Sequence, residues 1–266
     1  MSDLRADIAD GIGTITLDRP EALNALTGEV TESIARRIRE WEASASVDVV
    51  IVTGAGDRAF AAGADIPELR SKSGIEMTRR GMQHAVSVLR ESSLPTIAAL
   101  NGLAFGGGFE LALACDVRIS VPRATFAFPE TGLGIIPGAG GTQMLTRIAG
   151  SAVASHLILT GAHLRADRAH ELGIVASIHE PDDLMPAAAQ LAQEMRRKGP
   201  RALRLAKAAI AAANDTSMAA GLQVELLAQA VLFETADRDE GMDAFLARRQ
   251  PHFDGEVRHD EKESTS

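Results

Sequence analysis

The stretch Ile97-Ala-Ala-Leu-Asn-Gly-Leu-Ala-Phe-Gly-Gly-Gly-Phe-Glu110 decides the fold of this 266-residue chain. Its apolar start predicts a short buried strand, and Asn101-Gly102 predicts a turn. The three glycines precede an apolar run, Phe109 to Cys115, that predicts a helix. Glycines at a helix start leave backbone N–H groups unpaired, and the helix dipole adds positive potential there. The stretch therefore predicts a place where backbone N–H groups stabilise an oxyanion.

A second small-residue segment, Ala61-Ala-Gly-Ala-Asp-Ile66, also predicts close approach of the backbone to another group. Two N–H groups from separate loops could then hold one carbonyl oxygen. Glu110 lies in the first turn of the helix that follows the glycines, and Glu130 follows Pro129 twenty residues later. Two carboxylates beside a carbonyl-binding loop suit acid–base chemistry. Glycines before a helix and an acidic first turn also occur for structural reasons alone, so these residues leave both interpretations open.

The rest of the chain predicts an α/β body followed by a helical part. Alternating or continuous apolar runs predict strands, and apolar residues at helical spacing predict helices. The expected strands are 12–17, 47–53, 96–100, 117–121, 125–128 and a short one at 174–178. The expected helices are 27–43, 75–90, 109–115, one from the glycines at 138–141 to about 150, and then 152–159, 166–172, 184–197, 202–213, 222–235 and 240–248.

Composition and missing motifs exclude several classes of protein. A formal net charge of −9 and an aromatic content of 3 % argue against a nucleic-acid-binding surface. The single cysteine, Cys115, forms no intrachain disulfide and suits a packing role in a reducing compartment. The glycine clusters lack the spacing of a dinucleotide fingerprint, and the histidines lack metal-ligand spacing, so we expect neither a metal nor a redox cofactor. Neither a membrane span nor a signal segment is expected, and the expected location is the cytoplasm.

Several motifs together resemble the enoyl-CoA hydratase/isomerase (crotonase) superfamily. The resemblance runs in order along nearly the whole chain, and it is specific for the fold. It includes Ile97 through Val117 with its triple glycine and Cys115-Asp116, and it extends to Arg19-Pro-Glu-Ala-Leu-Asn-Ala-Leu26, Ala59-Phe-Ala-Ala-Gly-Ala-Asp-Ile66, Pro129-Glu130, Ile136-Pro-Gly-Ala-Gly-Gly-Thr-Gln143 and Glu240-Gly-Met-Asp-Ala-Phe245 with Arg248.

The resemblance implies an α/β fold, a crotonase-like spiral of ββα units followed by a helical C-terminal trimerisation region. We expect the spiral core over residues 1–198, the helical region over 199–255 and a flexible tail over 256–266. A homotrimer, or a hexamer made of two trimers, is expected.

The resemblance also implies a set of site residues. The backbone N–H groups of Ala64 and Gly107 would form an oxyanion hole for a thioester carbonyl, and Glu110 and Glu130 would be catalytic. Residues expected to border the acyl-CoA are Ala22, Arg58, Ala62, Ala64, Asp65, Ile66, Pro67, Gly107 and Pro129, with Arg58 near the phosphates. Relatives can carry lysine where this chain has Glu21 and Pro67, so we expect either fewer phosphate contacts here or contacts from a neighbouring subunit. Residues Lys72 to Met82 would shape the acyl pocket.

The two glutamates favour hydration of a trans-2-enoyl-CoA to a 3-hydroxyacyl-CoA in fatty-acid or related acyl-CoA metabolism. Glu110 would orient water and act as its base, and Glu130 would deliver a proton to Cα. Coenzyme A would be part of the substrate rather than a separate cofactor. Isomerisation, or hydration of a branched or functionalised acyl-CoA, stays open as an alternative. A non-catalytic RNA-binding or assembly role is a remote alternative that the two intact glutamates and the acidic balance disfavour.

Overall fold

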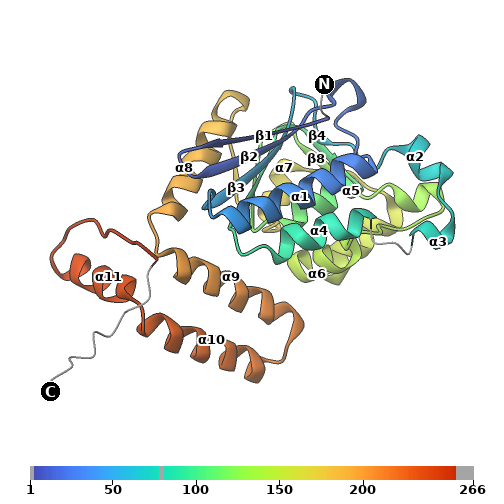
Figure 1. Ribbon diagram of the computed structural model, residues 1–266. Coiled ribbons are helices and arrows are strands. Elements are labelled where there is room, and N and C mark those ends of the chain that lie inside the picture. The colour runs from blue at the N-terminus through green and yellow to red at the C-terminus, as the bar shows by residue number, and fades with distance from the viewer. Residues whose placement is uncertain (1–2, 78–80, 256–266) are drawn as a thin grey trace, which may run out of the picture. The chain divides into compact units, whose positions relative to one another are not determined.

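The computed structural model describes residues 3–77 and 81–255 (Figure 1). The chain divides into two compact units, Met1–Ala192 and Gln193–Ser266. The tail expected over 256–266 lies outside the described residues.

The first unit is built on a six-stranded sheet whose central strands are fully buried. Its strands lie in the order β1 (Leu4–Ala9), β2 (Ile12–Leu17), β3 (Val49–Gly54), β5 (Thr96–Leu100), β7 (Val117–Ser120) and β10 (Ser177–Ile178). Only β1 pairs antiparallel to its neighbour, and the remaining pairs are parallel. Continuous apolar strands such as β3 are typical of a sheet covered on both faces.

The second sheet consists of short strands, three of which each follow a strand of the first sheet along the chain. Its order is β4 (Ala59–Ala61), β6 (Leu103–Phe105), β8 (Thr125–Ala127) and β9 (Leu164–Arg165). Along the chain, β4 follows β3, β6 follows β5, and β8 follows β7, and the latter two pairs each lead into a helix. This repetition confirms the expected spiral of ββα units. It also places the loops after β4, β6 and β8 at one edge of the second sheet, because these three strands pair in parallel.

Helices cover the sheets of the first unit. They are α1 (Gly28–Ser44), α2 (Ile66–Ser71), α3 (Gly74–Met77), α4 (Gly81–Glu91), α5 (Gly107–Ala114), α6 (Gly141–Thr160), α7 (Ala166–Glu171) and α8 (Leu184–Arg196), with short 3-10 turns at Pro20–Ala22, Glu130–Leu133 and Pro181–Asp183. Thr27 begins α1 as expected, because its side chain accepts a hydrogen bond from the Val30 N–H. A buried stripe on α1 includes Ile34, Ile38 and Trp41. Cys115 is buried after α5, which confirms its packing role.

Three of the elements need comment. The segment expected to be helical over 75–90 is helical in α3 and in α4, and residues 78–80, between them, lie outside the described residues. The two helices expected on either side of Gly150 are confirmed, because α6 is broken at Gly150, whose φ is +84°. Strand β1 was not expected, because its charged residues and its mostly exposed side chains hide the apolar pattern.

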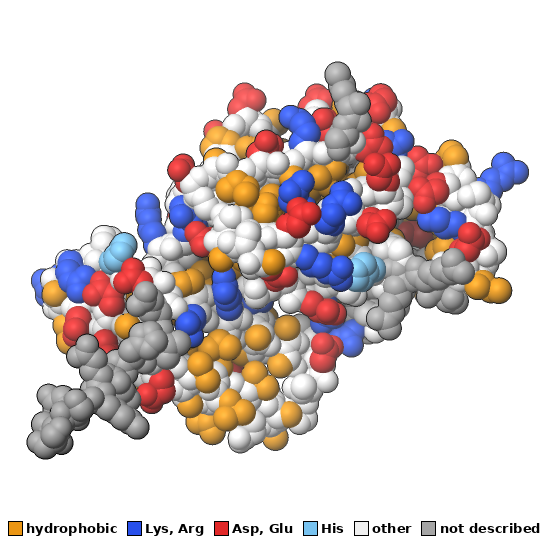
Figure 2. Space-filling view, viewed as in Figure 1, with side chains coloured by type: hydrophobic (Ala, Val, Ile, Leu, Met, Phe, Trp, Pro, Cys, Tyr) orange, Lys and Arg blue, Asp and Glu red, His pale blue; other side chains and the backbone are white. Residues whose placement is uncertain are grey.

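The second unit consists of helices, as expected. They are α9 (Pro200–Asp215), α10 (Met218–Phe233) and α11 (Ala236–Leu246). Ser217 and Thr235 begin α10 and α11 by accepting hydrogen bonds from backbone N–H groups in the first turn. Hydrophobic side chains gather on the exposed surface of α10 (Figure 2), among them Leu222, Leu226 and Val231. Among the described residues, no helix combines the length and the apolar character needed to cross a membrane.

Candidate active site

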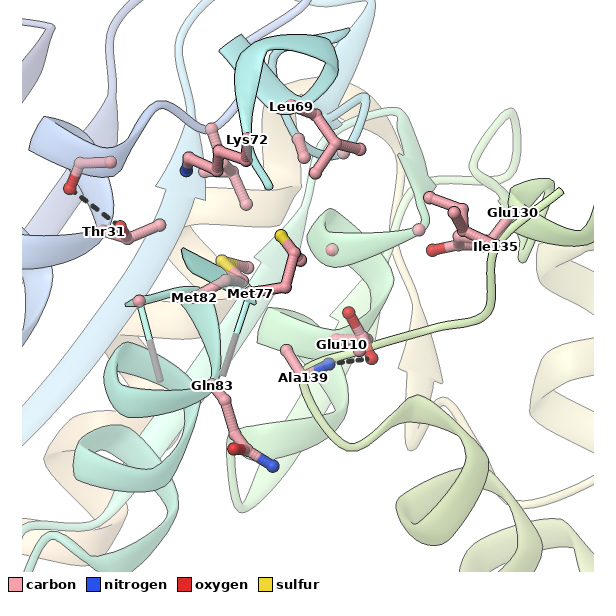
Figure 3. A pocket seen from close by; sticks show the side chains of 18 of the residues that line it. Thr31, Leu69, Lys72, Met77, Met82, Gln83, Glu110, Glu130, Ile135 and Ala139 are labelled. Atoms are coloured by element: carbon pink, nitrogen blue, oxygen red, sulfur yellow. Dashed lines mark hydrogen bonds between the residues drawn. The ribbon is translucent and has the colours of Figure 1, made fainter. Parts of the chain in front are cut away.

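A cavity of about 470 Å³ opens in the first unit beside the loops that follow β4, β6 and β8 (Figure 3). Its walls are formed by α1, α2, α3, α4 and the segment from Pro129 to Ala139. The lining residues that matter below are Ala62, Gly63, Ala64, Gly107, Glu110 and Glu130 on one wall, and Ile66, Leu69, Lys72, Met77, Met82 and Ile135 around the remainder.

Ala64 lines this cavity, and hydrogen bonds of the neighbouring backbone set the direction of its N–H. Gly63 O accepts a hydrogen bond from Leu26 N at 2.7 Å, and Asp65 N donates to Leu26 O at 3.0 Å. In a trans peptide the C=O and the N–H point in opposite directions. Since Gly63 O points at Leu26, the N–H of Ala64 points away from Leu26. Within the part of the chain that the structure describes, this N–H donates to no other backbone group.

The N–H of Gly107, at the start of α5, lies close to that of Ala64. Gly107 is the first residue of α5, so its N–H has no partner within the helix. A Cβ atom at Gly107 would lie 3.7 Å from Ala64 N, so no side chain separates the two amides. Two neighbouring backbone donors at the wall of a cavity can bind one carbonyl oxygen and stabilise negative charge on it.

Glycine is required around this pair of donors because the backbone segments touch. A Cβ atom at Gly108 would lie 2.2 Å from Ala61 O, which seats the start of α5 directly against β4. At Gly106 the φ is +50°, and a Cβ atom would lie 2.6 Å from Glu130 Oε1. The glycine run therefore serves two purposes: it allows close packing, and it leaves room for the Glu130 carboxylate.

Glu110 is buried at the wall of the cavity, with 2 % of its surface exposed. Its Oε1 accepts a hydrogen bond from Ala139 N at 2.7 Å (Figure 3) and another from Gly141 N at 2.8 Å. Gly141 begins α6, so the carboxylate lies at a helix N-terminus. Burial raises the pKa of Glu110, and the two backbone N–H groups offset this only in part. The hydrogen bonds fix one oxygen and leave Oε2 for a ligand.

Glu130 lies on the 3-10 turn after β8 and is 9 % exposed. Burial, with a smaller contribution from the nearby charge of Glu110, raises its pKa to about 7. Its Oε2 is buried and has no hydrogen-bond partner among the described residues. A carboxyl group with a pKa near neutrality is suited to donate and accept protons at neutral pH.

The structure brings together most of the residues that the sequence pointed to. Ala62, Ala64, Ile66, Gly107, Pro129 and both glutamates line the cavity, as do Lys72, Glu76, Met77 and Met82 from the predicted acyl-pocket segment. Ala22, Arg58, Asp65 and Pro67 are not among the described residues that line it. Arg58 lines a separate, open cavity with Arg123 and His163.

The amides of Ala139 and Gly141 were missed as partners of Glu110. The available signal was the glycine cluster at 138–141, which predicted a helix start but not what that start would bind. The role of the Asp65 carboxylate was also missed. As the N-cap residue of α2, Asp65 accepts a hydrogen bond from Glu68 N at 3.2 Å. Its carboxylate also forms an ion pair with Arg19 at 3.3 Å. Among the described residues, no cluster of histidine, cysteine and carboxylate side chains is arranged to hold a metal ion.

Comparisons with known proteins show which family this chain resembles in sequence and fold. Residues 7–256 match the family model described as enoyl-CoA hydratase/isomerase. The chain is 37 % identical to the crotonyl-CoA hydratase of Syntrophomonas wolfei, covering 91 % of this chain and 94 % of that protein. It is 39 % identical to the short-chain-enoyl-CoA hydratase of Clostridium acetobutylicum, covering 90 % and 92 %. The crystal structure of an enoyl-CoA hydratase from Bacillus anthracis superimposes with a TM-score of 0.92 at 37 % identity, covering 96 % of this chain and 100 % of that one.

Proposed function

Because this chain belongs to the enoyl-CoA hydratase/isomerase family, we propose that it adds water to a trans-2-enoyl-CoA and forms a 3-hydroxyacyl-CoA. Members of this family act on acyl-CoA thioesters. The observation that carries the hydratase assignment is the pair of buried carboxylates, Glu110 and Glu130, in one cavity with the converging amides of Ala64 and Gly107.

The two amides would bind the thioester oxygen. When water adds at Cβ, negative charge moves through the conjugated system onto that oxygen. The N–H groups of Ala64 and Gly107 would donate hydrogen bonds to it and stabilise the enolate. Fixed backbone donors are effective here because they need no reorganisation during the reaction.

The two carboxylates would divide the proton transfers. Glu110, as the carboxylate, would hold the water through Oε2 and take one of its protons while the oxygen bonds to Cβ. Glu130, as the acid, would deliver its proton to Cα as the enolate collapses. Glu110 then carries the proton taken from water and Glu130 is ionised, and proton exchange with solvent restores the starting state. The pKa of Glu130, raised to about 7, supports the acid role.

Coenzyme A would enter as part of the substrate. Ala62, Ala64, Ile66, Gly107 and Pro129 line the cavity and would border the thioester and the adjoining part of coenzyme A. Ala22, Arg58, Asp65 and Pro67 lie beyond the lining, and among them Arg58 supplies the positive charge suited to a phosphate. The apolar side chains of Leu69, Met77 and Met82 would surround the acyl chain.

The hydratase assignment is tested by offering the protein two regioisomers. With crotonyl-CoA, hydration removes the conjugated double bond, so the absorbance of the enoyl thioester falls. With a 3-enoyl-CoA, an isomerase would create that conjugation, so the absorbance would rise. Fast loss with a trans-2-enoyl-CoA and slow gain with the 3-enoyl-CoA is the expected result. The reverse pattern, or no change with short, long and branched trans-2-enoyl-CoAs, would overturn the assignment.

We also propose that the chain assembles as a homotrimer, or as a hexamer made of two trimers. The exposed apolar side chains of α10 support this, because patches of that kind commonly form contacts between subunits. Light scattering of the purified protein tests it: a trimer or hexamer mass is expected, and a monomer mass would contradict it.

A further inference from the structure

We propose that the ion pair between Arg19 and Asp65 is a positioning device that aims the Ala64 N–H into the oxyanion hole. The inference rests on the proposed function, because it concerns the amide that would bind the thioester oxygen. Neither side chain is among the described residues that line the cavity, so the pair would act through the backbone and not on the substrate.

The direction of the Ala64 N–H depends on one hydrogen bond. Leu26 N holds Gly63 O at 2.7 Å, and the planar peptide turns the N–H of Ala64 the opposite way. A displacement of Leu26 relative to Gly63 would rotate this peptide and misdirect the N–H. The aim of the donor is therefore set by how firmly the segment around Leu26 is tied to the segment around Ala64.

Arg19 makes that tie. Its Nη1 donates to Ala25 O at 3.0 Å and to Asp65 Oδ2 at 3.3 Å. Ala25 precedes Leu26, and Asp65 follows Ala64, so one nitrogen spans the two segments directly beside the pair of backbone hydrogen bonds. The guanidinium group is planar and offers several fixed donors, which a lysine would not reproduce.

Both partners are themselves held in place. Arg19 N donates to Asn24 Oδ1 at 3.0 Å, and Arg19 Nε lies 3.2 Å from Asp3 Oδ2. The other oxygen of Asp65 accepts from Glu68 N at the start of α2. The side chains of Arg19 and Asp65 are 20 % and 19 % exposed, so water screens this pair less than it screens a surface pair. A single mobile side chain would not fix the peptide between Gly63 and Ala64, but both members of the Arg19–Asp65 ion pair are held by further hydrogen bonds.

The test uses a bound thioester whose carbonyl reports directly on the hole. Butyryl-CoA has no double bond and cannot be hydrated, so its carbonyl stretch can be measured by difference infrared spectroscopy at equilibrium. Hydrogen bonds from two amides lower this frequency relative to free butyryl-CoA. If the unchanged protein binds butyryl-CoA without such a shift, the proposed oxyanion hole fails, whatever Arg19 does.

The variants are Arg19→Gln, Asp65→Asn and Arg19→Lys, and Arg5→Gln is the control. Arg5 forms a 2.8 Å ion pair with Asp18 that does not touch the Ala64 segment. For Arg19→Gln and Asp65→Asn we expect a smaller carbonyl shift and a kcat for crotonyl-CoA hydration lower by about 10- to 100-fold, less than the loss of a whole donor. The KM should change little, Arg19→Lys should recover part of the loss, and Arg5→Gln should behave like the unchanged protein.

The result that overturns the proposal is also defined. A purely structural pair would lower the melting temperature while the folded variants kept the full carbonyl shift and the full kcat. The same conclusion would follow if Arg5→Gln reduced the carbonyl frequency shift as much as Arg19→Gln does. The effect would then not depend on the Arg19–Asp65 ion pair beside Ala64.

Discussion

The two walls of the cavity are built in different ways. On the wall with Ala64, Gly107 and Glu110, the latter two residues are buried, and backbone hydrogen bonds hold the Ala64 segment and the Glu110 carboxylate. The opposite wall, formed by α2, α3 and the start of α4, consists of side chains from short helices with no buried residue in α2 or α3. Ile66 and Met77 on that wall are 51 % and 54 % exposed. The contrast suggests a rigid half that carries the chemistry and an adaptable half that accommodates the acyl chain.

The largest loss of activity is expected from replacing either carboxylate of the rigid half. Glu110→Gln and Glu130→Gln should each lower kcat for crotonyl-CoA hydration by about 10²–10⁴-fold, because an amide neither takes nor delivers the required proton. The measurement is the steady-state loss of enoyl-thioester absorbance. Glu91→Gln, at an exposed position of α4, is the matched control and should retain full activity. Two variants with nearly unchanged kcat and native circular dichroism would disprove the assigned roles.

A slightly smaller loss is expected from filling the oxyanion hole. In Gly107→Ala the new methyl group would lie 3.7 Å from Ala64 N, and its nearest contact is the flexible end of Met82 at 3.2 Å. The protein should therefore fold, while kcat should fall about 10²–10³-fold, as expected for a lost oxyanion donor. Gly132→Ala serves as the control, since its Cβ would meet nothing within 4 Å. Full activity of Gly107→Ala would place the carbonyl elsewhere in the cavity.

A change in the adaptable half should alter preference and not chemistry. Met82→Ala removes a side chain beside Gly107 and enlarges the space near the acyl chain. The ratio of kcat/KM for a longer enoyl-CoA over crotonyl-CoA should rise by about tenfold, because a few methylene groups in an apolar pocket are worth 1–3 kcal/mol. Met185→Ala on α8 is the control. If the ratio stayed constant while both rates fell together, Met82 would belong to the rigid half instead.

The smallest effect concerns stability and pH. Burial raises the pKa of Glu130 from its ordinary 4.5 to about 7, so the folded state favours the neutral acid. The stability linked to this proton is present below pH 4.5 and is lost as the pH rises through about 7. Glu130→Gln, which is always neutral, should therefore be more stable than the unchanged protein at pH 8 by about 1–3 kcal/mol, and nearly equal to it at pH 5.

Thermal melts at the two pH values measure this difference. Each kcal/mol corresponds to roughly 2–4 °C for a chain of this size. Glu91→Gln should melt with the unchanged protein at both pH values. If Glu130→Gln raised the melting temperature equally at pH 5 and pH 8, the change in stability would come from packing and not from the charge of Glu130.

Much of the rigid half could be predicted from the sequence, because its features are local. The glycine run, the small residues before Ala64 and the cap at Thr27 each have a direct backbone reason. The short strands β4, β6 and β9 could not be predicted, since two or three residues carry no measurable period. The ββα arrangement that contains them followed from resemblance and not from pattern.

Long-range contacts also escaped prediction. Glu110 and Gly141 are 31 positions apart, and Arg19 and Asp65 are 46 apart. No spacing rule connects such pairs, because the turns of the spiral that bring them together depend on the packing of the whole unit.

The most direct test of the hydration mechanism follows the atoms of water into the product. Crotonyl-CoA is incubated with the protein in heavy-oxygen water, and separately in deuterium oxide, and the acyl product is analysed by mass spectrometry and NMR. The account predicts one heavy oxygen at Cβ and one deuterium at Cα, with both incorporations abolished in Glu110→Gln and Glu130→Gln. A product that carries deuterium but no heavy oxygen, with its double bond moved, would contradict hydration and identify an isomerase.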